Sequence, residues 1–186
     1  MWRKPIHFIR ARLKKYLLEE IWLEDYIKLG MKIGEHCSIQ PGVTFDYSHA
    51  WLINIGHHVT IAPEAYILAH DASTKPLLGY TKIGKVTIKD HVFIGARAIV
   101  MPNVTIGEHS IIAAGSVVTK DIPPYSLAAG NPAKIIRSIT EYESKNKQLL
   151  DKITPFDSSY TLTGRITAEK KREMITSLKS GFGFVE

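Results

Sequence analysis

The most regular feature of this 186-residue sequence is a hydrophobic repeat with a period of six across residues 88–123. A branched aliphatic residue stands at every sixth position: Ile88, Ile94, Val100, Ile106, Ile112 and Val118. Four positions after each of these comes a second small or aliphatic residue: Val92, Ala98, Val104, Ser110, Ser116 and Ile122. Neither the helical period of about 3.6 nor simple strand alternation sustains a period of six. The pattern therefore predicts a repeat structure in which each hexad forms one flat side of a coil.

The repeat begins earlier in the chain and is interrupted twice. It starts at Ile33, slips over residues 51–54 and resumes at Ile55. The pair Ile-Gly recurs at residues 33–34, 55–56, 83–84, 94–95 and 106–107, where we expect the chain to bend. Between Leu68 and Ile83 the pattern fails, which predicts a loop extruded from the coil, a place where function tends to lie. We predict an all-β solenoid, a parallel β-helix over residues 31–138, with this loop at 71–82.

Helical patterns flank the repeat on both sides. Apolar residues recur at helical spacing over residues 3–29, and the charge changes from basic to acidic along them. This predicts an amphipathic helix within residues 1–30, which either caps the first coil or lies on an anionic membrane. Residues 139–186 are predicted as a helical extension with helices at 139–153 and 167–179, joined by a linker. Thr167 is a suitable N-cap for the second helix.

Composition limits the classes of partner. The net charge is +6, and the basic residues gather near both ends of the chain, which suits phosphates or lipid head groups without selecting nucleic acid. Cys37 is the single cysteine, so an internal disulfide and a CxxC metal site are excluded. No run of 18 apolar residues and no signal-peptide core occur, so we expect a cytoplasmic protein.

Most of the eight histidines fall at one repeat position. His36, His58, His91 and His109 share the fourth position of a hexad, an outward corner, and we expect them to be solvated. His70 shares that position but is the last regular residue before the loop. A neutral imidazole there could accept a proton from an acceptor hydroxyl, because its pKa lies near neutrality. Asp46 and His49 lie one coil earlier, and stacking of coils could bring them near His70.

Three stretches carry a resemblance to a known family: IAPEAYILAHD (61–71), VFIGARAIVMPNVTIGEHSIIAAGSVVTKDIP (92–123) and AAGNPAKIIR (128–137). They resemble the hexapeptide-repeat acyltransferases with a left-handed β-helix, nearest to the maltose, galactoside and capsule-polysaccharide O-acetyltransferases. The resemblance covers residues 33–139. It implies a left-handed coil, a homotrimer with sites between subunits, and acetyl-CoA as co-substrate with a saccharide acceptor.

The resemblance also implies roles for individual residues. His70 matches the general base, and Ala96 and Ala114 match positions whose main chain contacts the pantetheine arm of acetyl-CoA. Four residues match positions that hold the nucleotide end: Thr119, Lys120, Lys134 and Arg137. The cations among them suit phosphates.

The sequence alone leaves more than one role open for two aspartates and two aromatic residues. Asp46 either contacts the acceptor sugar or stabilises the turn before the slip at 51–54. Asp71 orients the His70 ring, binds the acceptor, or caps the loop turn. Trp51 and Tyr47 either stack on a sugar ring or pack at the edge of the slipped coil.

We expect an acetyl-CoA-dependent O-acetyltransferase in which a saccharide hydroxyl attacks the thioester directly, with no metal required. N-acetylation of an amino sugar or a xenobiotic uses the same base and remains an alternative. A γ-type carbonic anhydrase needs three histidines around zinc. His91 and His109 are eighteen positions apart, but position 96, where a third would stand, is alanine. The remaining alternative is a non-catalytic scaffold.

Overall fold

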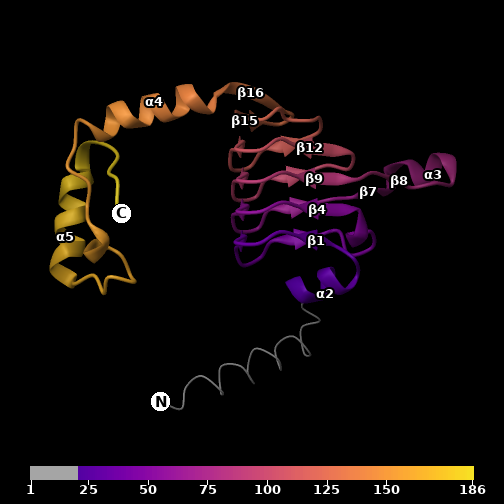
Figure 1. The fold of residues 1–186 in the computed structure, drawn as a ribbon, viewed down its shortest axis with the longest axis horizontal. Helices are drawn as coiled ribbons and strands as arrows, with labels where there is room; N and C mark the ends of the chain where they lie inside the picture. Colours follow the sequence, from indigo (N-terminus) through magenta and orange to yellow (C-terminus); the bar gives the residue numbers. More distant parts are fainter. Residues whose placement is uncertain (1–20) are drawn as a thin grey trace, which may run out of the picture. The chain divides into compact units, whose positions relative to one another are not determined.

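The computed structural model describes residues 21–186 of the chain, and three parallel β-sheets form its main body (Figure 1). The first sheet contains β1 (Lys32–Ile33), β4 (Ile53–Ile55), β9 (Val86–Ile88) and β12 (Val104–Ile106). The second contains β2 (Ser38–Ile39), β5 (Thr60–Ile61), β10 (Phe93–Ile94), β13 (Ile111–Ile112), β15 (Ser126–Gly130) and, antiparallel to β15, β16 (Ala133–Ser138). The third contains β3 (Thr44–Phe45), β6 (Tyr66–Ile67), β11 (Ile99–Val100) and β14 (Val117–Val118).

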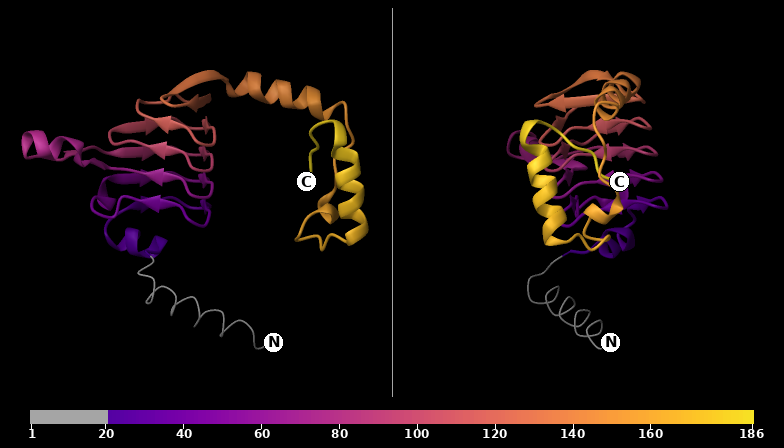
Figure 2. Two further views of the ribbon diagram at one scale, coloured as in Figure 1. Left: turned by 180° about the vertical axis from the view of Figure 1, so that it is seen from behind. Right: turned by 90° about the vertical axis from the view of Figure 1, so that its left-hand side faces the viewer.

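Consecutive strands go to the three sheets in turn, so that equivalent strands stack on one another (Figure 2). Val100 pairs with Val118 and Ile94 with Ile112, each eighteen residues further along the chain. One coil therefore consists of three hexads, and the predicted repeat residues lie in register. The parallel pairing predicted from the six-residue period is present.

Both sets of predicted inward residues form the core. Ile94, Val100, Ile106, Ile112 and Val118 have no exposed surface. The small positions between them are equally enclosed, including two serines whose hydroxyl groups need partners. Ser110 donates to the carbonyl of Pro123 over 2.9 Å, and Ser116 Oγ accepts from the amide of Gly130. Both enclosed serine hydroxyl groups are thus hydrogen-bonded.

The recurring Ile-Gly pairs have a steric cause. A Cβ atom on Gly95 would lie 2.4 Å from the backbone nitrogen of Ala114 in the next coil, and one on Gly107 would lie 2.3 Å from that of Pro124. The backbones of stacked coils approach so closely here that a side chain has no room. Glycine is needed at these positions for this close approach, where the sequence alone predicted a bend.

The predicted loop leaves the third sheet and returns to the first. Its base is a short antiparallel pair, β7 (His70–Asp71) with β8 (Lys82–Ile83). Between them lie the 3₁₀-helix η2 (Ala72–Thr74) and the helix α3 (Lys75–Leu78), at the end of the arm visible in Figure 1. The Thr74 hydroxyl donates to the carbonyl of Tyr80 over 2.7 Å and fastens the tip.

At the N-terminal end, α2 (Leu23–Lys28) precedes the first coil, and its Tyr26 is buried with the ring 5.3 Å from that of Phe45. The greater part of the helix predicted over residues 3–29, with its capping or membrane role, lies outside the described residues. The slip at 51–54 contains the 3₁₀-helix η1 (Ala50–Leu52). No helix among residues 21–186 is long and apolar enough to cross a membrane.

The chain divides into two compact units between Ile139 and Thr140. The second contains α4 (Ile139–Leu150, which begins at the division), η3 (Ser158–Tyr160), α5 (Ala168–Ser177) and η4 (Leu178–Ser180). Thr167 Oγ1 accepts from the amide of Lys170 and caps α5. The segment predicted as a linker makes contacts within this unit: Phe156 forms a β-bridge with Val185, and its ring lies 4.9 Å from that of Tyr160.

Candidate active site

The candidate site centres on His70, the first residue of the loop arm. Its Nδ1 atom lies 2.5 Å from Asp46 Oδ2, across 24 positions of sequence. Asp46 follows β3 and His70 follows β6, two strands that pair in the third sheet. Stacking of neighbouring coils therefore brings the two side chains together at one corner of the coil.

The Asp46 carboxylate is buried and accepts several hydrogen bonds. Its side chain is 1% exposed, and its carboxylate also accepts from the amides of Ala69 at 2.9 Å and His49 at 3.2 Å. Burial alone would raise the pKa of this carboxyl, but the hydrogen bonds from His70 and the Ala69 amide hold the pKa below its ordinary value. Asp46 is thus a carboxylate facing His70, and its bond from the His49 amide fits the turn-stabilising alternative, while its contact with an acceptor stays a prediction.

This arrangement determines which imidazole nitrogen is free. A carboxylate can only accept, so His70 Nδ1 must carry the proton that bridges the two groups. In the neutral ring, Nε2 then carries a lone pair. The His70 side chain is 31% exposed, so a bound molecule can reach it. The pair is chemically suited to removing a proton from a hydroxyl group.

A second histidine and a tryptophan extend the site. The His49 ring lies 5.3 Å from the ring of His70 and 5.4 Å from that of Trp51. Its Nδ1 atom is buried and has no hydrogen-bond partner among the described residues. Trp51 is 55% exposed, and Tyr47 is also exposed, with its ring edge-on to Tyr26. Sequence reasoning placed His49 near His70 but gave no sign of the unpaired nitrogen.

Asp71 differs from Asp46 in the groups that its carboxylate contacts. Its carboxylate accepts from the amide of Ser73 at 2.9 Å and lies 3.0 Å from the ammonium of Lys82. The hydrogen bonds from Ser73 and Lys82 lower the pKa of Asp71 to about 2. It caps the turn of the loop arm, and Asp46, not Asp71, contacts the His70 ring.

A separate groove of about 520 Å³ lies at the corner between the second and third sheets. Its lining residues are Pro63, Glu64, Ala96, Arg97, Ala114 and Gly115. The structure thus brings Ala96 and Ala114 together, as neighbours in stacked coils. Arg97 Nε lies 2.6 Å from Glu64 Oε2 at the same groove. His70 stands at the corner between the third and first sheets, so the groove and the histidine occupy different edges of one chain.

The four residues expected at the nucleotide end of acetyl-CoA lie in the last coils. Thr119 and Lys120 are exposed directly after β14, and Lys134 is exposed in β16. Arg137, also in β16, has a buried Nε atom without a hydrogen-bond partner among the described residues. An anionic group would satisfy that donor.

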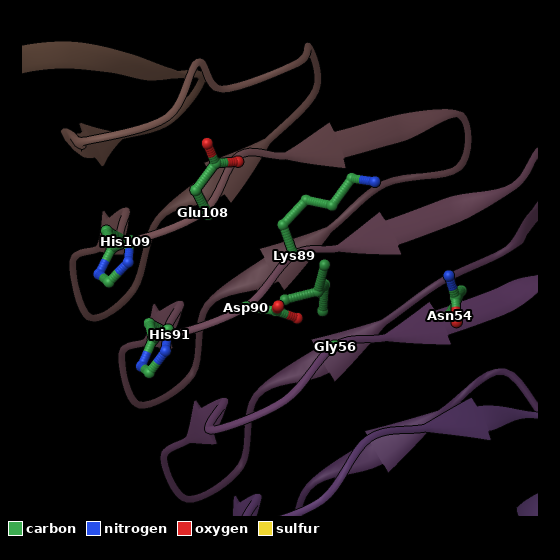
Figure 3. Close-up of a pocket in the computed structure, with 8 residues that line it drawn as sticks. Asn54, Gly56, Lys89, Asp90, His91, Glu108 and His109 are labelled. Carbon is green, nitrogen blue, oxygen red and sulfur yellow. The ribbon is translucent and has the colours of Figure 1, made fainter.

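The corner histidines form a continuous stack between the first and second sheets. Ring centroids are 4.9 Å apart for His36 and His58, 4.8 Å for His58 and His91, and 4.5 Å for His91 and His109. Figure 3 shows the last two beside an open pocket that Lys89 and Asp90 also line. The rings of His91 and His109 are nearly parallel, at 8°, so their nitrogens do not converge on one point as a zinc site requires.

Comparison with known proteins places the chain in a family. The family model of the bacterial transferase hexapeptide (six repeats) matches residues 85–120. YvoF of Bacillus subtilis, named as a candidate acetyltransferase, is 35% identical over 138 residues, which are 74% of this chain and 77% of that protein. The chain belongs to the hexapeptide-repeat acetyltransferases. The resemblance described from the sequence is thereby confirmed.

Further members of the family differ in length. The candidate acetyltransferase SAV2555 of Staphylococcus aureus is 35% identical over 125 residues, and this chain spans 63% of its length. Among solved structures, a hexapeptide-repeat acetyltransferase of Vibrio cholerae in complex with acetyl-CoA has a TM-score of 0.53 and 35% identity, covering 59% of this chain and 60% of that one. A galactoside acetyltransferase in complex with coenzyme A has a TM-score of 0.52 and 28% identity, covering 75% and 84%.

The corner with the extruded loop and the corner with the stacked histidines hold different groups. The corner with the extruded loop holds the Asp46–His70 pair, while the stacked histidines face another corner. The unpaired His49 nitrogen was not predicted from the sequence, whereas the helices of the C-terminal unit were.

Proposed function

We propose that this protein is an O-acetyltransferase that transfers the acetyl group of acetyl-CoA to a hydroxyl group of a saccharide. The observation that carries the proposal is the contact between His70 Nδ1 and the Asp46 carboxylate. It leaves Nε2 as an acceptor at an exposed position beside the loop arm. An oriented imidazole of this kind is the principal group that direct acyl transfer to a hydroxyl requires.

The chemistry proceeds without a covalent enzyme intermediate. His70 Nε2 takes the proton of the acceptor hydroxyl as its oxygen attacks the thioester carbonyl carbon. The tetrahedral intermediate expels the thiolate of coenzyme A, which receives the proton back from Nε2. Asp46 stabilises the imidazolium that exists between these two proton transfers. A backbone amide in the groove, that of Ala96, stabilises the oxyanion.

Three features support acetyl-CoA as the donor. The groove at Ala96 and Ala114 exposes main chain beside small side chains, and an extended pantetheine arm can pair with such an edge. Lys134 and Arg137, with Thr119 and Lys120, supply cations and hydroxyl donors for the phosphates. The relative from Vibrio cholerae contains acetyl-CoA.

The separation of groove and histidine supports an oligomer. Because Ala96 and His70 stand at different edges of one chain, a complete site needs a groove from one subunit and a histidine from its neighbour. A homotrimer of left-handed β-helices provides three such sites. Oligomeric state is measured directly by light scattering during size-exclusion chromatography, where a monomer would contradict this part of the proposal.

The experiment that tests the function measures coenzyme A release with a panel of monosaccharides, amino sugars and oligosaccharides. Products are then treated with neutral hydroxylamine, which cleaves acetyl esters and leaves acetamides intact. We expect a cleavable product from a neutral saccharide. A product formed only from amino sugars and resistant to hydroxylamine would show N-acetylation, and absence of any transfer would reject the proposed saccharide acceptor.

A further inference from the structure

His49 presents an unexplained polar atom next to His70. Its Nδ1 is buried, has no hydrogen-bond partner among the described residues, and lies 3.8 Å from Asp46 Oδ1. Leaving a buried imidazole nitrogen without a hydrogen-bond partner is energetically unfavourable. Such an atom in a native structure often marks the place of an ion or a water molecule. The surrounding atoms distinguish between these.

The neighbours of this nitrogen are metal-ligand atoms. One ligand atom each from Asp46, His49 and His70 lies within 4.8 Å of the other two, and among the described residues this is the one such group. Two histidines and a carboxylate are a common ligand set for zinc. With bond lengths of about 2.0–2.1 Å, an ion between two ligands holds them about 3.3–4 Å apart. The separation of 3.8 Å between His49 Nδ1 and Asp46 Oδ1 falls in this range.

The third ligand is already close. His70 Nδ1 lies 2.5 Å from the other carboxylate oxygen of Asp46, where a proton now bridges them. A small movement of the ring and loss of that proton would turn Nδ1 toward the ion. The side chains of His49 and His70 are 25% and 31% exposed, so an ion and a fourth, water ligand can enter from solvent.

We propose that Asp46, His49 and His70 form a binding site for Zn²⁺ or a similar transition-metal ion, and that occupation of this site inhibits acetyl transfer. The ion replaces the Nδ1 proton of His70, which passes to solvent. The neutral imidazole then carries its remaining proton on Nε2 and has no lone pair for the acceptor hydroxyl. The inhibitory consequence rests on the proposed function, whereas binding of the ion does not.

The histidine stack at the other corner is the competing place for a metal ion. It contains four exposed histidines, but no third ligand converges on any adjacent pair of them within the described residues. A single histidine or a pair binds zinc weakly compared with three convergent ligands. His36, at the end of the stack, therefore offers a matched control for loss of one imidazole.

Binding is tested with the metal ions alone. Metal-free protein is titrated with Zn²⁺ against a chromophoric chelator, and with Co²⁺ while visible absorption is recorded. We expect one tight equivalent of Zn²⁺ per chain and intense tetrahedral Co²⁺ bands in wild type and in His36→Ala. His49→Ala should bind at least about tenfold more weakly and lose the Co²⁺ bands. His49→Gln, which keeps a polar side chain, serves the same purpose should the alanine variant melt early.

The same variants test inhibition once an acceptor is known. Zn²⁺ should inhibit wild type and His36→Ala, a chelator should restore the rate, and His49→Ala should keep its own metal-free rate at the same Zn²⁺ concentration. Equal binding by wild type and both His49 variants would mean an adventitious ion only and would overturn the site. Tight binding without inhibition would overturn the regulatory role. Tight binding in a protein that acetylates no acceptor would leave the site standing and remove the proposed function instead.

Discussion

The Asp46 carboxylate lies 2.5 Å from His70 Nδ1 although 24 residues separate them in the sequence. The contact exists because β3 and β6 stack in the third sheet, which sets the residues that follow them side by side. The carboxylate is enclosed, while the imidazole reaches solvent. The fold thus presents one imidazole nitrogen outward while the other nitrogen is held by the carboxylate.

Replacing Asp46 by asparagine should impair catalysis more than binding. The amide has nearly the same shape, but it does not fix the Nδ1 proton and does not stabilise an imidazolium. We expect kcat to fall by about 10²–10⁴ in Asp46→Asn, with little change in the KM for acetyl-CoA. Steady-state kinetics measure both. Glu35→Gln, which removes an exposed carboxylate at the corner between the first and second sheets, is the control, and equal losses of kcat in the two variants would contradict the orienting role.

The same substitution should change how stability depends on pH. The pKa of Asp46 is lowered in the folded protein, so its ionised form favours folding. This contribution is fully present above the unfolded-state pKa of about 3.9 and is lost as pH falls through the lower folded value. Urea unfolding should show Asp46→Asn about 2–3 kcal/mol less stable than wild type at pH 7, with the difference shrinking below about pH 4. A difference that stays constant down to pH 3 would show that the charge has no part in stability.

A larger side chain at Ala96 should close the groove. Ala96→Leu places three further carbon atoms where the pantetheine arm is proposed to lie, so the KM for acetyl-CoA should rise by about tenfold or more. The KM for the acceptor and the melting temperature should change little. If the KM for acetyl-CoA instead stays unchanged and only the KM for the acceptor rises, the groove binds the acceptor.

The cations of β16 should contribute through the 3′-phosphate or the pyrophosphate. Lys134→Ala combined with Arg137→Ala should weaken coenzyme A binding by about tenfold or more, because charge-assisted hydrogen bonds are lost. Isothermal titration with coenzyme A and with 3′-dephospho-coenzyme A distinguishes contacts to the 3′-phosphate from contacts to the pyrophosphate. Lys152→Ala combined with Lys171→Ala, at two exposed positions of the C-terminal unit, removes the same number of charges and is the control. Unchanged affinity in the double variant would remove both residues from the donor site.

The close stacking of the coils leads to a further prediction, about the free energy of unfolding. Gly95→Ala would push a Cβ atom to 2.4 Å from the backbone of Ala114, so the coils must separate locally. We expect a loss of about 1–3 kcal/mol in the free energy of unfolding. Gly181→Ala, at a position with open space around it, is the matched control. Equal stability of the two variants would show that the coils absorb a methyl group without cost.

Much of the fold is predictable because one simple rule, a branched residue at every sixth position, acts on every coil. The buried positions from Ile88 to Val118 and the parallel register follow from it directly. The extruded loop is predictable for the opposite reason, since the rule fails between Leu68 and Ile83. His70 stands out as the last regular residue before that failure.

The details of the site are less predictable because they depend on irregular segments. Phe45 pairs with Ile67, a spacing of 22 residues, where regular coils have 18. The extra residues around η1 determine that Asp46 meets His70 and that His49 comes with it. Asp71 is adjacent in sequence to His70 and looks like its partner, yet its carboxylate turns to Ser73 and Lys82. Alternation along β7 directs neighbouring side chains to opposite sides.

The most direct test of the central claim is the rate of acetyl transfer by His70→Ala at saturating acetyl-CoA and acceptor. His36→Ala, which removes an exposed imidazole from another corner, is measured beside it, and circular dichroism checks the fold of both. The account predicts that kcat falls by about 10²–10⁴ in His70→Ala and stays within about twofold of wild type in His36→Ala. A folded His70→Ala variant that retains the wild-type kcat would contradict the assignment of His70 as the general base.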